Sequence, residues 1–468
     1  MKLDYTKLER AFNPRCVAVV GDKKEYNFMW LRTLSNFSGK VYSVQIDTEA
    51  AEKIRAMGIG NYTSLLDIPE PVDLVIVAVP RSAALSVLED CIVKDVAAAQ
   101  FFTSGFAETG TEEGIRLQDL LAERARAANF HLVGPNCMGI YSPAVGVRQS
   151  TIQDTGFTGP LGFISQSGTI AITFTVEAQP DGVSINKSVS FGNGVILDSP
   201  DYLDYFGRDD AIKAIGMYLE GVKDGRRFFN MLKEVAGRKP VVIWKGGQTG
   251  AGGRAIASHT GSLARPQPVW EAVVRQAGAV NAATSDELLD TLKSLLYMSP
   301  VRGNRLALVG GSGGESVTIT DSFVKAGLEV PPLTGKSYDE LATFFSLVGA
   351  GCRNPIDPGS NWRQLKRILD ITERDDNIDC LVVIFVWSAM RMFSREQLND
   401  FMNSVISMKN KTKKPVLAII PFYAIPEQQQ QAREMVTKLK TGGVPVFSTA
   451  ERAARALKNT MDYYSAKS

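Results

Sequence analysis

The segment CVAVVG at residues 16–21 and the longer run VDLVIVAVP at residues 72–80 decide the fold class. Both are short and rich in β-branched residues, and they end in Gly or Pro, which is typical of strands buried on both faces. A helical pattern, EEGIRLQDLLAERARAA, occupies residues 112–128 and places its apolar residues on one face. The strand pattern recurs at residues 41–46, 97–105 and 130–136. Apolar strands that alternate with helices predict a parallel, doubly wound α/β sheet, whose ligands bind beyond the carboxyl ends of the strands.

Two further series of strands follow this first one. The second begins with LGFISQSG at residues 161–168, and the third begins with RLALVGGSGG at residues 305–314. Pro and Gly in MSPVRGN, residues 298–304, mark a boundary between them. We therefore expect three doubly wound units, which span residues 1–145, 146–300 and 301–468.

The composition excludes several classes of protein. Of the 468 residues, 44% are apolar and 22% are charged, and the 52 basic and 50 acidic residues leave a net charge of +2. Because no basic patch is concentrated in the chain, we expect neither nucleic acid nor membrane as a partner. The charged start MKLDYTKLER is unlike a secretory signal, and the five cysteines show no CxxC spacing. These features predict free thiols and a cytoplasmic protein.

The most informative stretch is WKGGQTGAGGRAIASHTGSLA at residues 244–264, which contains His259, one of two histidines in the chain. Its many glycines and small residues disfavour a packed helix or strand and predict a mobile loop with an imidazole at its tip. A neutral imidazole is a competent nucleophile near physiological pH. The alternative is a surface loop with an incidental histidine.

Two other segments could support chemistry at an imidazole. FISQSGTIAITFTV at residues 163–176 predicts a strand, a tight turn and a helix, whose start at Ser167 and Gly168 could hold an anion. Such junctions are also common without any ligand. Glu220 ends a predicted strand in MYLEGVKDG, and its carboxylate could accept a hydrogen bond from an imidazole N–H. A strand-end Glu is otherwise a helix cap or an ion-pair partner.

These motifs together resemble the nucleoside-diphosphate-forming acyl-CoA synthetases, of the ADP-forming acetyl-CoA synthetase alpha-subunit type, in the succinyl-CoA synthetase superfamily. The phosphohistidine segment of that family is similar to SHTGSLA at residues 258–264. The matches run in the family's order from about residue 10 to residue 465. The other similar segments are TSGFAE (103–108), GPNCMG (134–139), SQSG (165–168), YLEG (218–221), GGSGG (310–314) with Asp321, and NPID (354–357).

The resemblance implies a Rossmann-like CoA-binding domain followed by two flavodoxin-like domains. It also implies a reaction in which acyl-CoA, phosphate and ADP are interconverted with the acid, CoA and ATP through an acyl phosphate and a phosphohistidine. His259 would carry the phosphoryl group, Glu220 would orient it, and this chain would bind no metal. The phosphate would contact Ser167, Gly168, Gly134 and Gly261. Coenzyme A would contact Gly21, Lys23, Val79, Pro80, Ser104, Gly105, Phe106, Asn136 and Cys137.

The first turn departs from the family's pattern. It reads VVGDKKEYNFMW at residues 19–30, where the family has small residues. Lys23 or Lys24 could meet the phosphates of CoA as point charges, but bulky residues would crowd a close approach of the backbone. Cys137 could instead be a buried small hydrophobe, and His131 is expected to be a structural histidine in a core strand.

The resemblance further implies that a nucleotide-grasping domain, which binds the Mg-nucleotide, lies on a partner beta-type subunit in a heterotetramer. A second hypothesis is a CoA-binding protein of the same scaffold that transfers acyl groups or CoA without nucleotide. A nicotinamide-dependent oxidoreductase is disfavoured, because GDKKEY at residues 21–26 lacks the GxGxxG pattern. No basic cluster indicates a dicarboxylate substrate.

Overall fold

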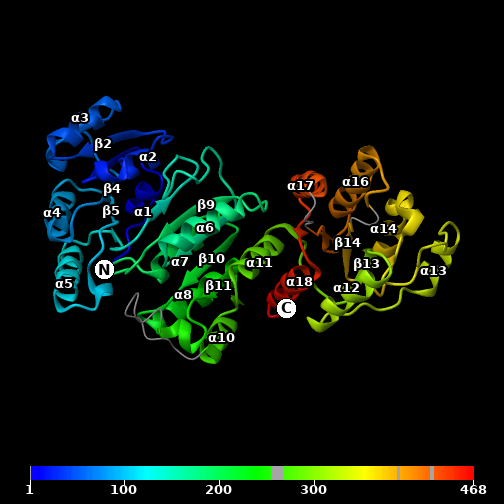
Figure 1. Cartoon of the computed structure of the whole chain (residues 1–468). Coiled ribbons are helices and arrows are strands. Elements are labelled where there is room, and N and C mark those ends of the chain that lie inside the picture. Colours follow the sequence, from blue (N-terminus) through cyan, green and yellow to red (C-terminus); the bar gives the residue numbers. More distant parts are fainter. Residues whose placement is uncertain (1, 255–266, 387–389, 422–425, 468) are drawn as a thin grey trace. The chain divides into compact units, whose positions relative to one another are not determined.

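The computed structural model describes residues 2–254, 267–386, 390–421 and 426–467 (Figure 1). Two compact units make up the chain, Met1–Ala283 and Thr284–Ser468. The segment with His259 and Gly261 lies outside the described residues. Among the described helices, none is both long and apolar enough to cross a membrane.

The first unit opens with a six-stranded sheet of order β3-β2-β1-β4-β5-β6, in which every pairing is parallel. This is the strand order of a Rossmann-like domain, as predicted, and the order reverses between β1 and β4. A ligand crevice is expected at that reversal, beyond the carboxyl ends of these two strands. The strands are β1 (Cys16–Val20), β2 (Lys40–Val44), β3 (Gly60–Tyr62), β4 (Leu74–Val77), β5 (Ala98–Phe101) and β6 (Leu132–Val133).

Helices cover both faces of this sheet, because alternate residues of its strands are apolar on both sides. Val17 and Val19 of β1 share a core with one set of helices, whereas Ala18 and Val20 share a core with the other. The first set is α1 (Tyr5–Phe12), α2 (Met29–Thr33) and α3 (Thr48–Ala56), and the second is α4 (Ala84–Val93) and α5 (Glu112–Ala127). The predicted helix over residues 112–128 is thus α5, which Thr111 caps by accepting from the Gly114 N–H.

The second sheet of this unit has the order β12-β11-β10-β8-β9-β7. Five of its strands are parallel, and β7 pairs with β9 in the antiparallel direction at one edge. Phe174 of α6 stacks on Phe163 of β8 with ring centroids 4.0 Å apart, whereas α7, α8 and α10 share the core with Ile164, Ile215 and Met217. The strands are β7 (Gly139–Tyr141), β8 (Leu161–Ser165), β9 (Ile185–Ser190), β10 (Ala214–Leu219), β11 (Val241–Lys245) and β12 (Val280–Ala282), and the helices are α6 (Gly168–Ala178), α7 (Ser199–Arg208), α8 (Gly225–Arg238) and α10 (Gln267–Gln276).

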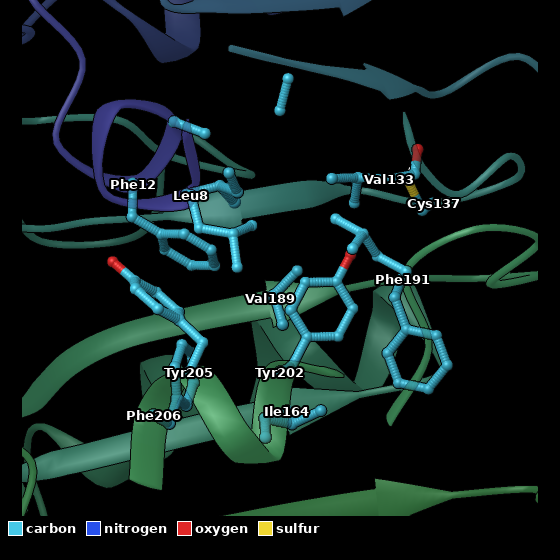
Figure 2. Packing of buried hydrophobic residues seen from close by; sticks show 14 of the residues in the cluster. Leu8, Phe12, Val133, Cys137, Ile164, Val189, Phe191, Tyr202, Tyr205 and Phe206 are labelled. Carbon is cyan, nitrogen blue, oxygen red and sulfur yellow. Dashed lines mark hydrogen bonds between the residues drawn. The ribbon is translucent and has the colours of Figure 1, made fainter. Parts of the chain in front are cut away.

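The two sheets of the first unit share one hydrophobic core (Figure 2). Leu8 and Phe12 of α1 pack against Tyr205 and Phe206 of α7, and the Phe12 and Tyr205 rings lie 5.1 Å apart. The Tyr205 hydroxyl also donates to Glu9 at 2.6 Å. Burying a side chain as large as Phe12 contributes about 1.5–3 kcal/mol. The packing therefore fixes the two sheets of the first unit relative to each other.

The second unit contains a parallel sheet of order β13-β14-β15-β16. Its strands match the third predicted series and confirm the α/β fold class. The strands are β13 (Leu306–Gly310), β14 (Cys380–Ile384), β15 (Val416–Ile419) and β16 (Val446–Phe447), and the helices are α11 (Ser285–Tyr297), α12 (Gly314–Lys325), α13 (Gly335–Ala342), α14 (Leu365–Arg374), α16 (Arg395–Lys411), α17 (Pro426–Thr441) and α18 (Ala450–Ser465).

Helix α11 precedes the boundary expected at residues 298–304, yet it packs on α18 within the second unit. Its buried Asp290 pairs with Lys293 at 3.0 Å and with Arg452 of α18 at 2.6 Å. The division into three domains at residues 145 and 300 stays a proposal.

Candidate functional site

Four motifs that are far apart in the sequence line one pocket of about 360 Å³ at the carboxyl edge of the second sheet. We call it the Glu220 pocket. Six of its lining residues were predicted from the sequence: Ser104, Asn136, Cys137, Ser167, Gly168 and Glu220. The other six are Phe102, Met138, Gln166, Thr169, Gly192 and Asn193.

The turn between β8 and α6 brings the start of a helix to this pocket. Ser167 is the N-cap of α6, and its hydroxyl accepts from the Ile170 N–H at 3.4 Å. The Ser165 hydroxyl donates to the Ser167 carbonyl at 2.6 Å and so holds the turn closed. The first amides of an α-helix have no partner within the helix, and the helix dipole is positive at that end. Gly168 and Thr169 therefore give the pocket the character of an anion site.

Glu220 follows β10 directly and is buried, with 6% of its surface exposed. Its backbone N–H donates to Gln166 Oε1 at 2.8 Å, and its carbonyl accepts from Lys245 Nζ at 2.6 Å. The Tyr218 hydroxyl lies 3.4 Å from Glu220 Oε1 and donates to it. Burial, together with the charge of Glu220, raises the pKa of Tyr218, so that the phenol keeps the proton it donates. The backbone of Glu220 is thus held by Gln166 and Lys245, and its carboxyl group accepts from Tyr218 of its own strand.

The GPNCMG turn meets the turn that follows β9 on another side of the pocket. Asn136 has a φ of 58°, and its N–H donates to the Thr103 carbonyl at 3.0 Å. Gly192 has a φ of 51°, and a Cβ atom there would lie 2.1 Å from the Asn136 carbonyl oxygen. Only glycine allows these two backbones to approach so closely. Gly134 does not line the pocket. It supports the same turn, because a Cβ atom there would lie 2.8 Å from Cys137 Sγ.

Cys137 lines the pocket as a neutral thiol. Burial raises its pKa to about 12, and its Sγ donates to the carbonyls of Phe101 and Val133 at 3.5 and 3.6 Å. A thiol that stays protonated is a poor nucleophile, so the side chain serves as a small buried group at the wall.

In the predicted CoA loop TSGFAE, a side chain of the loop itself already binds two of the backbone N–H groups. The N–H groups of Gly105 and Phe106 both donate to Glu108 Oε1, at 2.6 and 3.1 Å. The Phe106 side chain is buried in the core of the first sheet. Of the three residues predicted for CoA here, only Ser104 lines the Glu220 pocket.

Asn193 ties this loop to the pocket, although the sequence interpretation gave it no role. Its Nδ2 donates to Glu108 Oε2 at 2.7 Å and to Gln118 Oε1 at 2.9 Å. The Lys223 ammonium group donates to the carbonyls of Asn193 and Gly194. The turn after β9 is therefore fixed from both sheets.

A second cavity of about 760 Å³ lies at the strand-order reversal of the first sheet, and we call it the β1–β4 groove. Gly21, Lys23, Val79 and Pro80 all line it. The Gly21 N–H is used within the sheet, where it donates to the Val44 carbonyl at 3.0 Å, and a Cβ atom at Gly21 would lie 2.6 Å from Val79 Cγ1. Gly21 therefore permits the close approach of β1 and β4.

The long turn after Gly21 is built around the buried Asp22. Its carboxylate accepts from the Lys23 N–H at 3.0 Å and from the Leu31 N–H at 2.9 Å. Burial raises the pKa of Asp22 above its usual value. Lys24 is paired with Glu49 at 2.5 Å. The bulky residues of this turn are accommodated while the groove stays open.

His131 is separate from these cavities. It is fully buried, and its Nε2 accepts from the Asp4 N–H at 3.3 Å. Burial lowers its pKa to about 4, which keeps the imidazole neutral. This is the structural histidine that was expected. The described residues contain no group of three or more His, Cys, Asp or Glu side chains that could hold a metal ion.

Comparison with known proteins adds two family matches. The CoA binding domain family matches residues 15–143, and the succinyl-CoA ligase like flavodoxin domain family matches residues 158–295. The alpha subunit of acetate–CoA ligase [ADP-forming] II from Pyrococcus furiosus is 34% identical over 456 residues, which is 96% of each chain. Acetate–CoA ligase [ADP-forming] I from Archaeoglobus fulgidus is 32% identical over 96% of this chain, which spans 63% of that longer protein.

A solved structure is also similar over nearly the whole chain. It is the dinucleotide-forming acetyl-coenzyme A synthetase 1 of Candidatus Korarchaeum cryptofilum, in complex with phosphate and ADP. The TM-score is 0.85 at 28% identity, and the match covers 98% of this chain and 97% of that one.

Proposed function

The chain belongs to the ADP-forming acetate–CoA ligase family, and we propose that it acts as the alpha-type subunit of such an acyl-CoA synthetase. The enzyme is an acid–thiol ligase that interconverts acyl-CoA, phosphate and ADP with the acid, CoA and ATP. The observation that carries the proposal for this chain is the convergence of the GPNCMG turn, the SQSG turn and Glu220 on one pocket.

We assign the chemistry as follows. Phosphate bound at Ser167 and Gly168 attacks the thioester carbonyl, CoA leaves as the thiol, and an acyl phosphate remains. An imidazole nitrogen of His259 then attacks phosphorus, so that the acid is released and a phosphohistidine forms. Gly134 and Gly261 would support the phosphate site. Glu220 accepts a hydrogen bond from the N–H of the other ring nitrogen and so stabilises the phosphorylated ring.

Coenzyme A would extend from the β1–β4 groove towards the Glu220 pocket. Lys23 would face its phosphates, and Gly21, Val79 and Pro80 would form the wall of the groove. Ser104, Asn136 and Cys137 would line the path of the pantetheine arm, where Ser104 and Asn136 can donate hydrogen bonds. Gly105 and Phe106 would support the loop that presents Ser104. We propose this path from the sequence motifs and from the residues that line the two cavities.

The nucleotide step would take place on a partner. An alpha-type subunit implies a second subunit, which we propose is a beta-type chain with an ATP-grasp domain that holds the Mg-nucleotide, in a heterotetramer. Its role is to accept the phosphoryl group from His259. We also propose a cytoplasmic location, since all five cysteines are free thiols.

The test is peptide mapping by mass spectrometry after the purified chain is incubated with a panel of acyl-CoAs and inorganic phosphate, under conditions that preserve phosphohistidine. We expect a phosphoryl group on His259 with at least one acyl-CoA, and none in His259→Ala. If His259 stays unmodified even with the beta-type subunit, ATP and magnesium, the proposed function is wrong. Acyl or CoA transfer without nucleotide would then be the better account.

A further inference from the structure

The peptide of Glu220 is held from both of the neighbouring strands of its sheet. Strand β10, which ends just before Glu220, lies between β8 and β11. Gln166 directly follows β8, and Lys245 is the last residue of β11. Because the three strands are parallel, their carboxyl ends meet at one edge, and both side chains can reach the same peptide unit.

Gln166 binds the amide side of this turn. Its Oε1 accepts from the Glu220 N–H at 2.8 Å and from the Gly221 N–H at 3.1 Å. Its own N–H donates to the Tyr218 carbonyl at 3.0 Å, so that its backbone is also tied to β10. The two accepted bonds determine which end of the side-chain amide faces the strand. Gln166 therefore fixes the direction in which the chain leaves β10 while it also lines the Glu220 pocket.

Lys245 binds the carbonyl side. Its Nζ donates to the Glu220 carbonyl at 2.6 Å and to the Gly246 carbonyl at 2.7 Å. The side chain is buried with 6% exposed, and within the described ranges it forms no ion pair with a carboxylate. Burial lowers its pKa, whereas the nearby charge of Glu220 acts in the opposite direction. A buried ammonium group that binds only carbonyls is costly if stability is its sole purpose.

We propose that Gln166 and Lys245 are positioning residues for the Glu220 carboxyl group in phosphoryl transfer. They fix the two sides of the Glu220 peptide, and so they set where the carboxylate stands relative to the phosphohistidine. Neither side chain needs to touch the reacting atoms. This inference rests on the proposed function, in which Glu220 orients the imidazole of His259.

The experiment compares single-turnover phosphorylation of His259 in the full chain with two near-isosteric variants. Gln166→Leu removes the acceptor for both N–H groups, and Lys245→Met removes the donor for both carbonyls. We expect each to slow phosphorylation by about 10- to 100-fold, as is usual when groups behind a catalytic residue are lost. The acyl-CoA concentration that gives half the maximal single-turnover rate should stay within about two-fold, because the β1–β4 groove is unchanged. Lys245→Arg, which keeps the charge and the donors, should recover most of the rate.

The chain offers closely matched controls. Gln153 is also buried, and its Oε1 accepts from two successive backbone amides, those of Gln149 and Ser150. Lys239 precedes β11 at its other end, and its Nζ donates to the carbonyls of Phe206 and Asp209. Gln153→Leu and Lys239→Met should lower the free energy of unfolding without slowing phosphorylation.

Each outcome is decisive. If wild-type protein is phosphorylated and Gln166→Leu and Lys245→Met match its rate, the positioning role is wrong while the proposed function stands. The role is also wrong if the control variants slow the reaction as much as these two do, since the effect would then follow stability. If the wild type itself is never phosphorylated, the proposed function fails first and this inference fails with it.

Discussion

The turns that leave β1 and β8 begin alike and end differently. Both follow a buried parallel strand in the first unit. After β8 only Gln166 and Ser167 separate the strand from the eleven-residue helix α6. After β1 the chain runs from Gly21 to Phe28, through a short 3-10 helix, before the five-residue helix α2 begins. A short turn presents a helix start to the ligand, whereas a long one must first satisfy its own backbone.

The backbone and side-chain polar groups of the two turns make different hydrogen bonds as a result. At the β1 turn, the Gly21 N–H binds Val44, and the Asp22 carboxylate takes two further amides. What remains to face the groove is side chains such as Lys23. At the β8 turn, the start of α6 faces the Glu220 pocket through Gly168 and Thr169. The difference agrees with the roles proposed above, in which the β8 turn would bind phosphate through backbone amides and the β1 turn would meet the phosphates of CoA through a flexible cation.

The largest effect should come from Gly168→Ala in the β8 turn. A Cβ atom there would lie 2.6 Å from Met138 Cγ, so the Met138 side chain must move within the pocket that both residues line. We expect phosphate-dependent phosphorylation of His259 to slow by about 100-fold, because a small misplacement at a reacting centre is costly. Single-turnover kinetics would measure this, with circular dichroism to verify the fold. A rate near that of the wild type would mean that the helix start does not hold the phosphate.

The next largest effect should be on stability, from Asp22→Ala in the β1 turn. The change leaves the N–H groups of Lys23 and Leu31 without their acceptor. We expect a loss of about 2 kcal/mol in the free energy of unfolding, which urea denaturation would measure. A loss below about 0.5 kcal/mol would show that this carboxylate does not organise the turn.

Asp22→Asn sharpens the same prediction through pH. Because burial raises the folded-state pKa of Asp22, its contribution to stability is complete below the unfolded-state pKa and declines as pH rises through the folded-state value. Asparagine does not titrate. The stability of Asp22→Asn relative to wild type should therefore improve as the pH rises above about 4, the unfolded-state pKa of an aspartate. A difference that is constant with pH would contradict the assignment.

The smallest effect should come from Lys23→Ala. An exposed point charge contributes little, so we expect the dissociation constant for CoA to rise by only about two- to five-fold, and the difference to shrink at high salt. Isothermal titration calorimetry at two salt concentrations would measure it. Lys24→Ala is the matched control, because Lys24 is already paired with Glu49 and should change CoA binding less. A larger effect at Lys24 would reverse the roles of the two lysines.

The sequence was sufficient to predict the fold class because the spacing of apolar residues, and the Gly and Pro residues that end the strands, are local properties of the chain. Strands such as residues 72–80 and the helix at residues 112–128 lie where the pattern predicted them. The edge strand β7 was not predicted, since Gly139–Tyr141 is only three residues long and its partner β9 is far away in the sequence. The antiparallel pairing depends on the tertiary structure.

The candidate site was predictable only in part, for the same reason. Ser167, Gly168 and Glu220 could be singled out as candidate site residues because strand ends and helix starts can be recognised from the local sequence pattern. The contact between Gln166 and Glu220 joins residues 54 positions apart, and that between Asn193 and Glu108 joins residues 85 apart. A single polar residue gives no sign of such a partner. At the β1 turn the bulky residues suggested crowding. Residues 23–26 instead line the open β1–β4 groove, in a turn that the buried Asp22 organises.

The contact between α1 and α7 has a consequence for synthesis. Glu9 and Tyr205 are 196 positions apart, and Phe12 packs on the same tyrosine. At a translation rate of about 5–20 residues per second, the first helix is made about 10–40 s before its buried partner exists. During that interval the part of the apolar face of α1 that later contacts α7 is exposed to solvent or to a chaperone. The nascent chain thus completes the packing around α1 only after α7 has been made, and an early pause or truncation before α7 should leave a species prone to aggregation.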